Sequence, residues 1–230
     1  MDLRTFDVLT FDCYGTLIDW ELGITTALRA VLSPRGVRAA DDELLEAYAQ
    51  EEAAAEAGAY LRYRDILARC LRGVCEGYGV VPTEDEIAGF AGSVGAWPAF
   101  PDSSQALNRL ARRFRLGVIT NCDDDLFALS NTRLGVTFDW VVTAQQAGSY
   151  KPSLHNFELA FSRIAIPRRR ILHVAQSLYH DHVPAKRLGL RTVWVNRRHD
   201  RPGSGATPVA VAEPDLIVPD MATLAEFALR

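Results

Sequence analysis

The chain has 230 residues, of which 48% are hydrophobic and 23% are charged, and its formal net charge is −4 at pH 7. This composition is typical of a globular protein with one large core, and a mildly acidic chain lacks the broad positive surface that binds nucleic acid or an anionic membrane. No apolar run reaches the roughly 18 residues of a membrane span, and the first residues lack the basic and then apolar pattern of a signal peptide. We therefore expect a cytoplasmic protein without a nucleic-acid or membrane partner.

The first predicted element is a buried strand that ends in a carboxylate. The apolar run Val-Leu-Thr-Phe at residues 8–11 predicts a strand inside a sheet, and Asp-Cys-Tyr-Gly-Thr-Leu follows at residues 12–17. In open α/β sheets, ligands bind beyond the carboxyl ends of the strands, where turns leave backbone N–H groups free. Asp12 is therefore a candidate nucleophile, because a carboxylate can attack an electrophilic carbon or phosphorus and form an ester. The alternative is an aspartate that only caps the turn.

Residues 20–95 have helical periodicity and almost no strand pattern. A helix is predicted over 40–57, where acidic residues occupy the first turn, and another over 60–78, where apolar residues recur near one face. A third helix is predicted to begin at Thr83, because Thr-Glu-Asp-Glu has the form of a capping box. We expect this block to be an all-helical insertion between the first strand and the rest of the sheet.

Strand and helix patterns alternate from about residue 101 onward. Alternation at this spacing indicates βαβ units and a mainly parallel sheet. The predicted fold class is α/β, a doubly wound parallel sheet with an inserted helical cap; residues 1–17 and 98–230 form the core and residues 18–97 the cap. Strands are expected over 116–120, 140–143, 171–175, 192–196 and 216–218, and helices over 102–113, 123–133, 152–165, 181–188 and 221–229.

Polar segments follow three of the later predicted strands. Thr120 and Asn121 end the first of them, and their side chains can hydrogen-bond a carboxylate or a phosphoryl oxygen without adding charge. Lys151 precedes a predicted helix, and a lysine beside a nucleophilic aspartate would keep that aspartate ionised. Ser177 and Asp181 lie in a polar loop after the strand at 171–175. Taken singly, each segment has an ordinary alternative as a turn, a surface lysine or a solvated loop.

Together, in this order, the four segments resemble the motifs of the haloacid dehalogenase superfamily of hydrolases. Residues 12–17 are similar to the first motif of that superfamily, Thr120 or Asn121 to the second, Lys151 to the third and Asp181 to the fourth. The resemblance covers the whole chain. It implies a Rossmann-like core with its active site beneath a mobile cap.

The resemblance also implies a role for each of these side chains. Asp12 would form a covalent aspartyl ester, and Lys151 and Asn121 would orient it. Thr16 and the N–H groups of the turn would hold the substrate anion. Asp181 would position or deprotonate the water that hydrolyses the ester.

Tyr14 favours dehalogenation over phosphate transfer. Phosphatases of the superfamily carry a second aspartate at this position as general acid, whereas a phenol with a pKa near about 10 is a poor acid at neutral pH. The sequence Asp-x-Tyr-Gly-Thr resembles the L-2-haloacid dehalogenases of type II, whose halide leaves without a proton. The expected function is therefore 2-haloacid dehalogenase-like hydrolysis of a small anionic substrate. The alternatives are a magnesium-dependent small-molecule phosphatase and a catalytically silent member kept for binding or regulation.

The dehalogenase interpretation implies no cofactor and no metal ion. The Gly-Asp that opens the fourth phosphatase motif is replaced here by Ala175 and Gln176, which removes a carboxylate of the kind that Mg²⁺ prefers. If Mg²⁺ binds, its ligands would be Asp12, Asp181 and the carbonyl of Tyr14. A homodimer is one option for the oligomeric state.

The cap departs from the dehalogenase pattern. Those enzymes resemble one another in a cap arginine that receives the substrate carboxylate, and the matching position here falls near Ala49. Their tyrosine six residues after the lysine corresponds to Phe157. Arg62 or Arg64 is the predicted replacement for the cation, and ordinary surface arginines are the alternative. The predicted substrate-binding residues are Tyr14, Thr16, Thr120, Ser177, Arg62 and Arg64.

Overall fold

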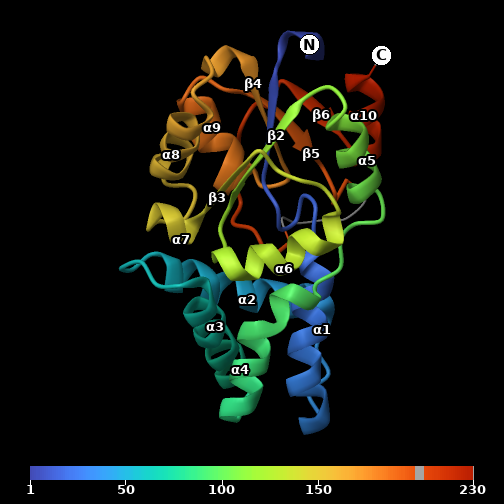
Figure 1. Cartoon of the computed structure of the whole chain (residues 1–230). Helices are drawn as coiled ribbons and strands as arrows, with labels where there is room; N and C mark the ends of the chain where they lie inside the picture. Colours follow the sequence, from blue (N-terminus) through green and yellow to red (C-terminus); the bar gives the residue numbers. More distant parts are fainter. Residues whose placement is uncertain (200–204, 230) are drawn as a thin grey trace.

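A computed structural model describes residues 1–199 and 205–229, and six strands of this part of the chain form one parallel sheet (Figure 1). The strands are β1 (Val8–Phe11), β2 (Arg115–Thr120), β3 (Trp140–Thr143), β4 (Ile171–Ala175), β5 (Arg191–Val195) and β6 (Leu216–Val218). Their order across the sheet is β3-β2-β1-β4-β5-β6. All four residues of β1 are buried, as is usual for a central parallel strand that is covered on both faces.

The site is positioned by the pairing of β1 with the strands on either side. Phe11, the last residue of β1, lies opposite Val118 of β2 and Val174 of β4. The chain leaves β1 toward one neighbour and later returns to the other, so this is the topological switch point at which doubly wound sheets bind ligands. Asp12 follows Phe11 and therefore emerges at this point.

Helices cover both faces of the sheet. Outside the cap they are α5 (Ser103–Leu110), α6 (Asp124–Leu134), α7 (Ala144–Ala147), α8 (Leu154–Ile164), α9 (Val183–Arg187) and α10 (Met221–Ala228). Because successive side chains of a strand point to opposite faces, Val8 joins an apolar cluster with Phe157 of α8. Leu9 joins the other cluster, which includes Leu107 of α5 and Leu224 of α10.

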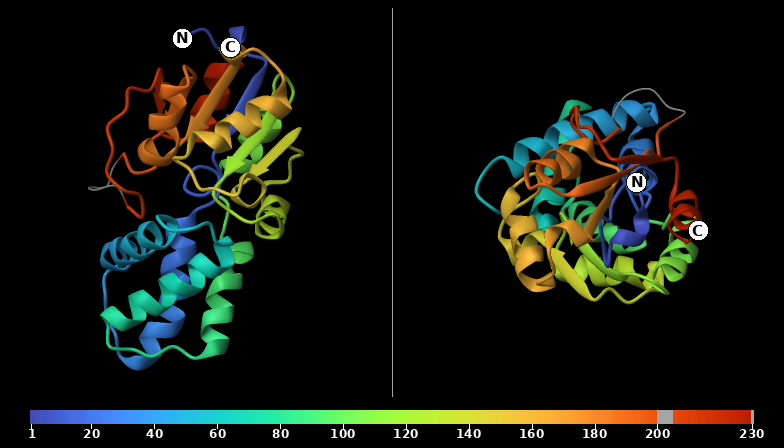
Figure 2. Two further views of the ribbon diagram at one scale, coloured as in Figure 1. Left: turned by 90° about the vertical axis from the view of Figure 1, so that its left-hand side faces the viewer. Right: turned by 90° about the horizontal axis from the view of Figure 1, so that it is seen from above.

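Four helices form a separate lobe next to the carboxyl ends of the strands, below the sheet in the left view of Figure 2. They are α1 (Trp20–Leu32), α2 (Asp41–Glu56), α3 (Tyr63–Gly77) and α4 (Glu84–Gly92). The Asp19 side chain accepts a hydrogen bond from the Leu22 N–H at the start of α1, and Thr83 and Glu86 form the capping box expected at the start of α4. These side chains satisfy N–H groups that have no partner within the helix.

The fold class predicted from the sequence, α/β with a doubly wound parallel sheet and an inserted helical cap, is confirmed. We keep the predicted bounds, residues 18–97 for the cap and residues 1–17 and 98–230 for the core. In the described part of the chain, no helix is both long enough and apolar enough to span a bilayer. The remaining short elements are η1 (Leu3–Thr5), η2 (Ser33–Arg35), η3 (Ser93–Ala96), η4 (Arg168–Arg170) and the π-helical turn η5 (Leu178–His182).

Candidate active site

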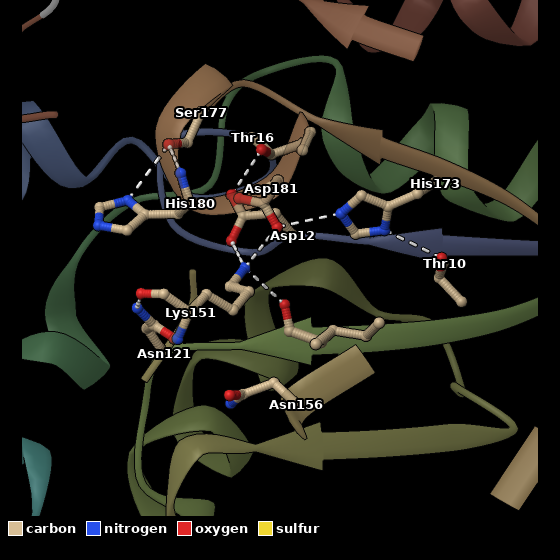
Figure 3. Close-up of polar contacts among 12 residues, drawn as sticks. Thr10, Asp12, Thr16, Asn121, Lys151, Asn156, His173, Ser177, His180 and Asp181 are labelled. Carbon is tan, nitrogen blue, oxygen red and sulfur yellow. Dashed lines mark hydrogen bonds and ion pairs between the residues drawn. The ribbon is translucent and has the colours of Figure 1, made fainter. Parts of the chain in front are cut away.

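Asp12 lies directly beyond the carboxyl end of β1, and two donors hold its side chain (Figure 3). Lys151 Nζ donates to Asp12 Oδ1 at 2.8 Å, and Thr16 Oγ1 donates to Asp12 Oδ2 at 2.7 Å. Burial raises the pKa of Asp12, and the Lys151 ammonium opposes that rise. The carboxylate is thus fixed next to a positive charge, which is the arrangement that a nucleophilic carboxylate needs.

Lys151 joins the nucleophile to β2 and to the loop after β4. Its Nζ donates to Asp12 Oδ1 at 2.8 Å, to Asp181 Oδ1 at 2.7 Å and to the Ile119 carbonyl at 2.8 Å. An ammonium has three donors, so all of them are used inside a site where only 1% of the side chain is exposed. Burial by itself lowers the pKa of Lys151, but the two carboxylates outweigh it and raise that pKa. Lys151 therefore remains a cation between them.

Asn121 positions Lys151 and does not bond to Asp12. Its Oδ1 accepts a hydrogen bond from the Lys151 N–H at 2.7 Å, and its Nδ2 donates to the Lys151 carbonyl at 3.1 Å. These bonds fix the segment that carries the lysine. Thr120 is buried at the end of β2 and does not line the cavity, and its hydroxyl has no hydrogen-bond partner among the described residues. The structure brings Asn121 to the site but not the Thr120 hydroxyl.

Asp181 is completely buried and is oriented by a chain of hydrogen bonds that starts in the sheet. Thr10 and His173 lie opposite each other in β1 and β4, and the Thr10 hydroxyl is 3.0 Å from His173 Nδ1. His173 Nε2 is 3.0 Å from Asp181 Oδ1. Burial opposes ionisation of Asp181, but Lys151 and His173 hold its pKa below the usual value. Asp181 Oδ2 has no hydrogen-bond partner among the described residues, so it is available to a water or a substrate.

The loop after Asp12 requires the small residue that the motif provides. Gly15 has φ +90°, and a Cβ there would lie 2.9 Å from Trp20 Nε1 and 3.2 Å from Gln176 Oε1, so a larger residue would be strained and crowded. Thr16 Oγ1 accepts a hydrogen bond from the Gln176 N–H at 2.8 Å. The Arg197 guanidinium, from the segment after β5, donates to the Thr16 carbonyl. The loop is therefore rigid around the nucleophile.

Tyr14 forms part of the cavity wall and is not placed as an acid. Its hydroxyl is 3.0 Å from Ser130 Oγ and accepts a hydrogen bond from Cys122 Sγ at 3.3 Å. Its ring meets that of Trp97 edge to face, with centroids 5.7 Å apart. Burial raises the pKa of Tyr14 well above its usual value. The phenol is thus neutral, and its hydroxyl is bonded to Ser130 and Cys122, so it is not placed to donate a proton to a leaving group at neutral pH.

A small cavity of about 30 Å³ lies between the sheet edge and the cap. It has room for about one or two water molecules, and it adjoins a second cavity of about 180 Å³ that Glu52, Glu56, Lys151 and His180 also line. Ser177 lines the small cavity, and the Ser177 hydroxyl is 3.2 Å from His180 Nδ1. Burial lowers the pKa of His180 to about 4, which leaves the imidazole neutral at neutral pH. The residues that line the small cavity are Asp12, Tyr14, Trp20, Glu52, Glu56, Tyr63, Asn121, Lys151, Ser177, His180, Asp181 and Thr207.

The cap wall of this cavity is acidic, a feature that the sequence analysis missed. Glu52 and Glu56 lie four residues apart on α2 and therefore on the same side of the helix. Tyr48 and Tyr63 each donate a hydrogen bond to Glu52 Oε1 at 2.8 Å. Burial raises the pKa of Glu52 to about 7, although these two hydroxyls oppose it. Burial and the Glu52 charge also raise the pKa of Glu56 well above its usual value, and Lys151 opposes this.

The two predicted cap arginines lie elsewhere. Arg62 Nε is 3.7 Å from Asp123 Oδ2, and Arg64 donates to Asp125 at 2.7 Å. Neither arginine lines the cavity. The buried Asp123 carboxylate also accepts hydrogen bonds from the Tyr63 and Arg64 N–H groups at the start of α3. These contacts connect the cap to the core, so the structure gives Arg62 and Arg64 a place in this junction and not beside Asp12.

The carboxylates of the site offer few free oxygens to a metal ion. Both oxygens of Asp12 and one oxygen of Asp181 already accept hydrogen bonds from Lys151 or Thr16. Over residues 1–199 and 205–229, no group of three or more His, Cys, Asp and Glu side chains is arranged to hold a metal ion. Mg²⁺ prefers about six oxygen ligands in octahedral geometry. If Mg²⁺ bound here, Asp12, Asp181 and the Tyr14 carbonyl would supply only part of this shell, and the Asp12 oxygens would have to be shared with Lys151 and Thr16.

The raised pKa of Glu52 predicts that stability falls as the pH rises. Between its usual pKa of 4.5 and about 7, the folded state binds more protons than the unfolded state, so the free energy of unfolding decreases with pH in this window. Each pKa unit corresponds to about 1.4 kcal/mol. We expect Glu52→Gln to flatten this decrease in urea unfolding at pH values from 5 to 8. Equal pH slopes in both proteins would show that Glu52 titrates normally.

Comparisons with known proteins identify the family of the chain. Residues 6–188 match the family model described as haloacid dehalogenase-like hydrolase. The chain is 22% identical to the (S)-2-haloacid dehalogenase of Pseudomonas putida over 99% of both chains. It is also 29% identical to the pyrimidine 5'-nucleotidase YjjG of Escherichia coli strain K12, over 47% of this chain and 49% of the relative.

The fold is also similar to that of a solved enzyme. The L-2-haloacid dehalogenase from Xanthobacter autotrophicus with chloropropionic acid covalently bound superposes with a TM-score of 0.81 at 20% identity, covering 97% of this chain and 98% of the other. At this identity the likeness shows the fold alone. The family match extends over most of the chain and includes Asp12, Lys151 and Asp181, which the structure brings together in one buried cluster. The chain belongs to the haloacid dehalogenase-like hydrolase family and is a hydrolase.

Proposed function

We propose that this protein hydrolyses a small substrate through a covalent ester at Asp12, in a 2-haloacid dehalogenase-like reaction whose leaving group departs as an anion. One observation carries the proposal: the position that would supply a leaving-group proton holds Tyr14, a buried phenol bonded to Ser130 and Cys122. A halide is a stable anion and needs no proton, whereas an alkoxide leaving group does. The reaction at Asp12 is thus suited to a carbon–halogen bond.

The first half of the reaction is displacement at carbon. A carboxylate oxygen of Asp12 attacks the carbon that carries the halogen, the carbon–halogen bond breaks, and the halide leaves with the electron pair. Lys151 keeps Asp12 ionised beforehand, since its ammonium touches Oδ1 at 2.8 Å. Thr16 holds the other oxygen, so the nucleophile is oriented before the substrate arrives.

The second half is hydrolysis of the ester. Water attacks the carbonyl carbon of Asp12, and the bond between that carbon and the substrate oxygen breaks. One proton of the water goes to the departing oxygen, which leaves as the hydroxyl of the product, and the other is released to solvent as Asp12 returns to a carboxylate. The water needs a hydrogen-bond acceptor to orient it, and Asp181 Oδ2 is a buried acceptor with no partner in the described part of the chain. His173 and Lys151 hold the Asp181 carboxylate by its other oxygen. Asp181 therefore positions the attacking water.

The named relatives suggest the first substrates to test. A 2-haloacid is a small anion, as the sequence analysis expects, and the curated relative from Pseudomonas putida is named for this class. Release of halide from (S)-2-chloropropionate and related 2-halo compounds is the direct assay. Halide release above the uncatalysed rate, lost in Asp12→Asn, supports the proposal. Turnover of a phosphate panel without halide release would contradict it.

Phosphate-ester hydrolysis is the second candidate. It is favoured by the partial similarity to a nucleotidase and by Asp181 Oδ2, the one oxygen of the Asp12 and Asp181 carboxylates that has no hydrogen-bond partner among the described residues. It would require a proton donor in place of Tyr14 and a Mg²⁺ ion, for which Asp12, Asp181 and the Tyr14 carbonyl would be the protein ligands. Release of inorganic phosphate from a panel of small phosphate esters, with and without Mg²⁺, separates this candidate from the first.

Chelation provides a further prediction. Lys151 already supplies the positive charge between Asp12 and Asp181, which at about 4 Å and an effective dielectric of 20 would otherwise repel each other by roughly 4 kcal/mol. We therefore expect halide release to be unchanged after dialysis against EDTA. Enzyme supplemented with Mg²⁺ serves as the control. Loss of activity on chelation and recovery with Mg²⁺ would contradict the dehalogenase-like assignment.

A further inference from the structure

The cap side of the cavity presents acids where a substrate carboxylate would need a cation. Glu52 and Glu56 line the same cavity as Asp12, and Glu52 is only 5% exposed. No described lysine or arginine other than Lys151 lines this space. Lys151 already donates all three of its hydrogen bonds, to Asp12, Asp181 and a backbone carbonyl. An anionic group near the cap would therefore face carboxyl groups without a compensating charge.

The two glutamates offer one acceptor and one donor. Glu52 Oε1 accepts from Tyr48 and Tyr63, and no described group bonds to Oε2, which leaves an acceptor at the cavity. Two hydroxyls donate to Glu52 and stabilise its charge, no described group donates to Glu56, and burial and the Glu52 charge raise the pKa of Glu56, so a proton retained by the pair resides on Glu56. Their spacing of four residues places them as neighbours on α2. A group that donates to one and accepts from the other complements this pair.

We propose that Glu52 and Glu56 determine specificity, and that they select a substrate with an uncharged hydrogen-bond donor and acceptor beside the reacting carbon, such as a carboxamide, over one with a carboxylate. The inference rests on the proposed reaction at Asp12 and changes only the group that the cap recognises. A carboxamide N–H would meet Glu52, and its carbonyl would accept from Glu56. A carboxylate would leave Glu52 facing a like charge in a poorly solvated cavity, which disfavours that ligand.

A pair of substrates of almost equal shape tests the proposal. Halide release is measured at about pH 8 from (S)-2-chloropropionamide and from (S)-2-chloropropionate, with the uncatalysed rates subtracted. We expect kcat/KM for the amide to exceed that for the acid by at least about tenfold, mostly through a lower KM, because recognition of a donor by a buried acceptor discriminates strongly. No halide from either substrate would overturn the proposed function itself. A higher kcat/KM for the acid than for the amide would be consistent with the proposed function and would overturn this inference.

Variants connect the preference to the cap. Glu52→Gln keeps the shape of the side chain and removes its charge. It should lower the amide-to-acid ratio of kcat/KM by at least about tenfold, because the acid no longer meets a like charge and its kcat/KM rises. Glu56→Ala, at the partly exposed end of α2, removes the donor to the amide carbonyl and should also lower the amide-to-acid ratio, through a higher KM for the amide. This variant provides the test if Glu52→Gln does not fold. Glu51→Gln makes the same charge change on the same helix outside the cavity lining and should leave the ratio unchanged. Equal ratios in the wild type, Glu52→Gln and Glu56→Ala would contradict the assignment.

Discussion

Asp12→Asn is expected to lower kcat for halide release by at least about three orders of magnitude, because an amide is a poor nucleophile. The replacement is nearly isosteric, and its carbonyl can still accept from Lys151 as Oδ1 now does. We therefore expect the melting temperature to stay within about 5 °C of the wild-type value. Activity is measured by halide release and folding by circular dichroism during heating.

Asp7→Asn is the matched control for this substitution. Asp7 precedes β1, at its opposite end, and pairs with Arg170 away from the cavity. It should keep wild-type kcat within about twofold, since surface ion pairs contribute little. If Asp12→Asn retained more than a tenth of the wild-type kcat, Asp12 would not be the nucleophile.

Lys151→Met is expected to abolish turnover and also to destabilise the fold. Without the ammonium, two buried carboxylates face each other, and breaking a buried ion pair in this way costs about 3–5 kcal/mol. Asp12 would then be protonated more easily and attack more slowly. Urea unfolding measures the loss of stability, and halide release measures the loss of activity.

Lys186→Met is the control, because Lys186 is the only other lysine in the sequence. It pairs with Asp215 and has a side chain that is 32% exposed, so its loss should cost about 1 kcal/mol or less. Adding Asp181→Asn to Lys151→Met should recover part of the stability by removing one buried charge. Equal destabilisation by both lysine substitutions would show that the Lys151 cluster contributes no more than a surface pair.

The sequence predicts the core side of the site because strand ends converge. Asp12 follows an apolar strand, and the pairing of parallel strands brings the segments after β1, β2, β3 and β4 to the same edge of the sheet. Polar residues at those ends are therefore expected to meet, and Lys151 and Asp181 lie beside Asp12. His173 was not predicted, because a histidine inside a buried strand looks like any other core residue until its neighbour Thr10 is known.

The cap side is harder to predict, because it depends on contacts between distant segments. Arg62 and Arg64 are candidate cations by residue type, but their partners Asp123 and Asp125 are about sixty residues away in the chain. Glu52 looks like a surface residue in an acidic helix, and only the packing of α2 against α3 buries it. Helical periodicity shows which residues share a face but not which cavity that face covers.

The origin of the product oxygen tests the covalent mechanism most directly. In a single turnover in 18O-labelled water, with enzyme in excess over substrate, the Asp12 ester forms with an unlabelled oxygen of its own. Water then attacks the Asp12 carbonyl carbon, so one labelled oxygen remains in the enzyme while the product carries the original one. We predict that mass spectrometry of the peptide containing Asp12 will show this label and that the product will not. Label in the product alone would mean that water attacks the substrate directly and that Asp12 forms no ester.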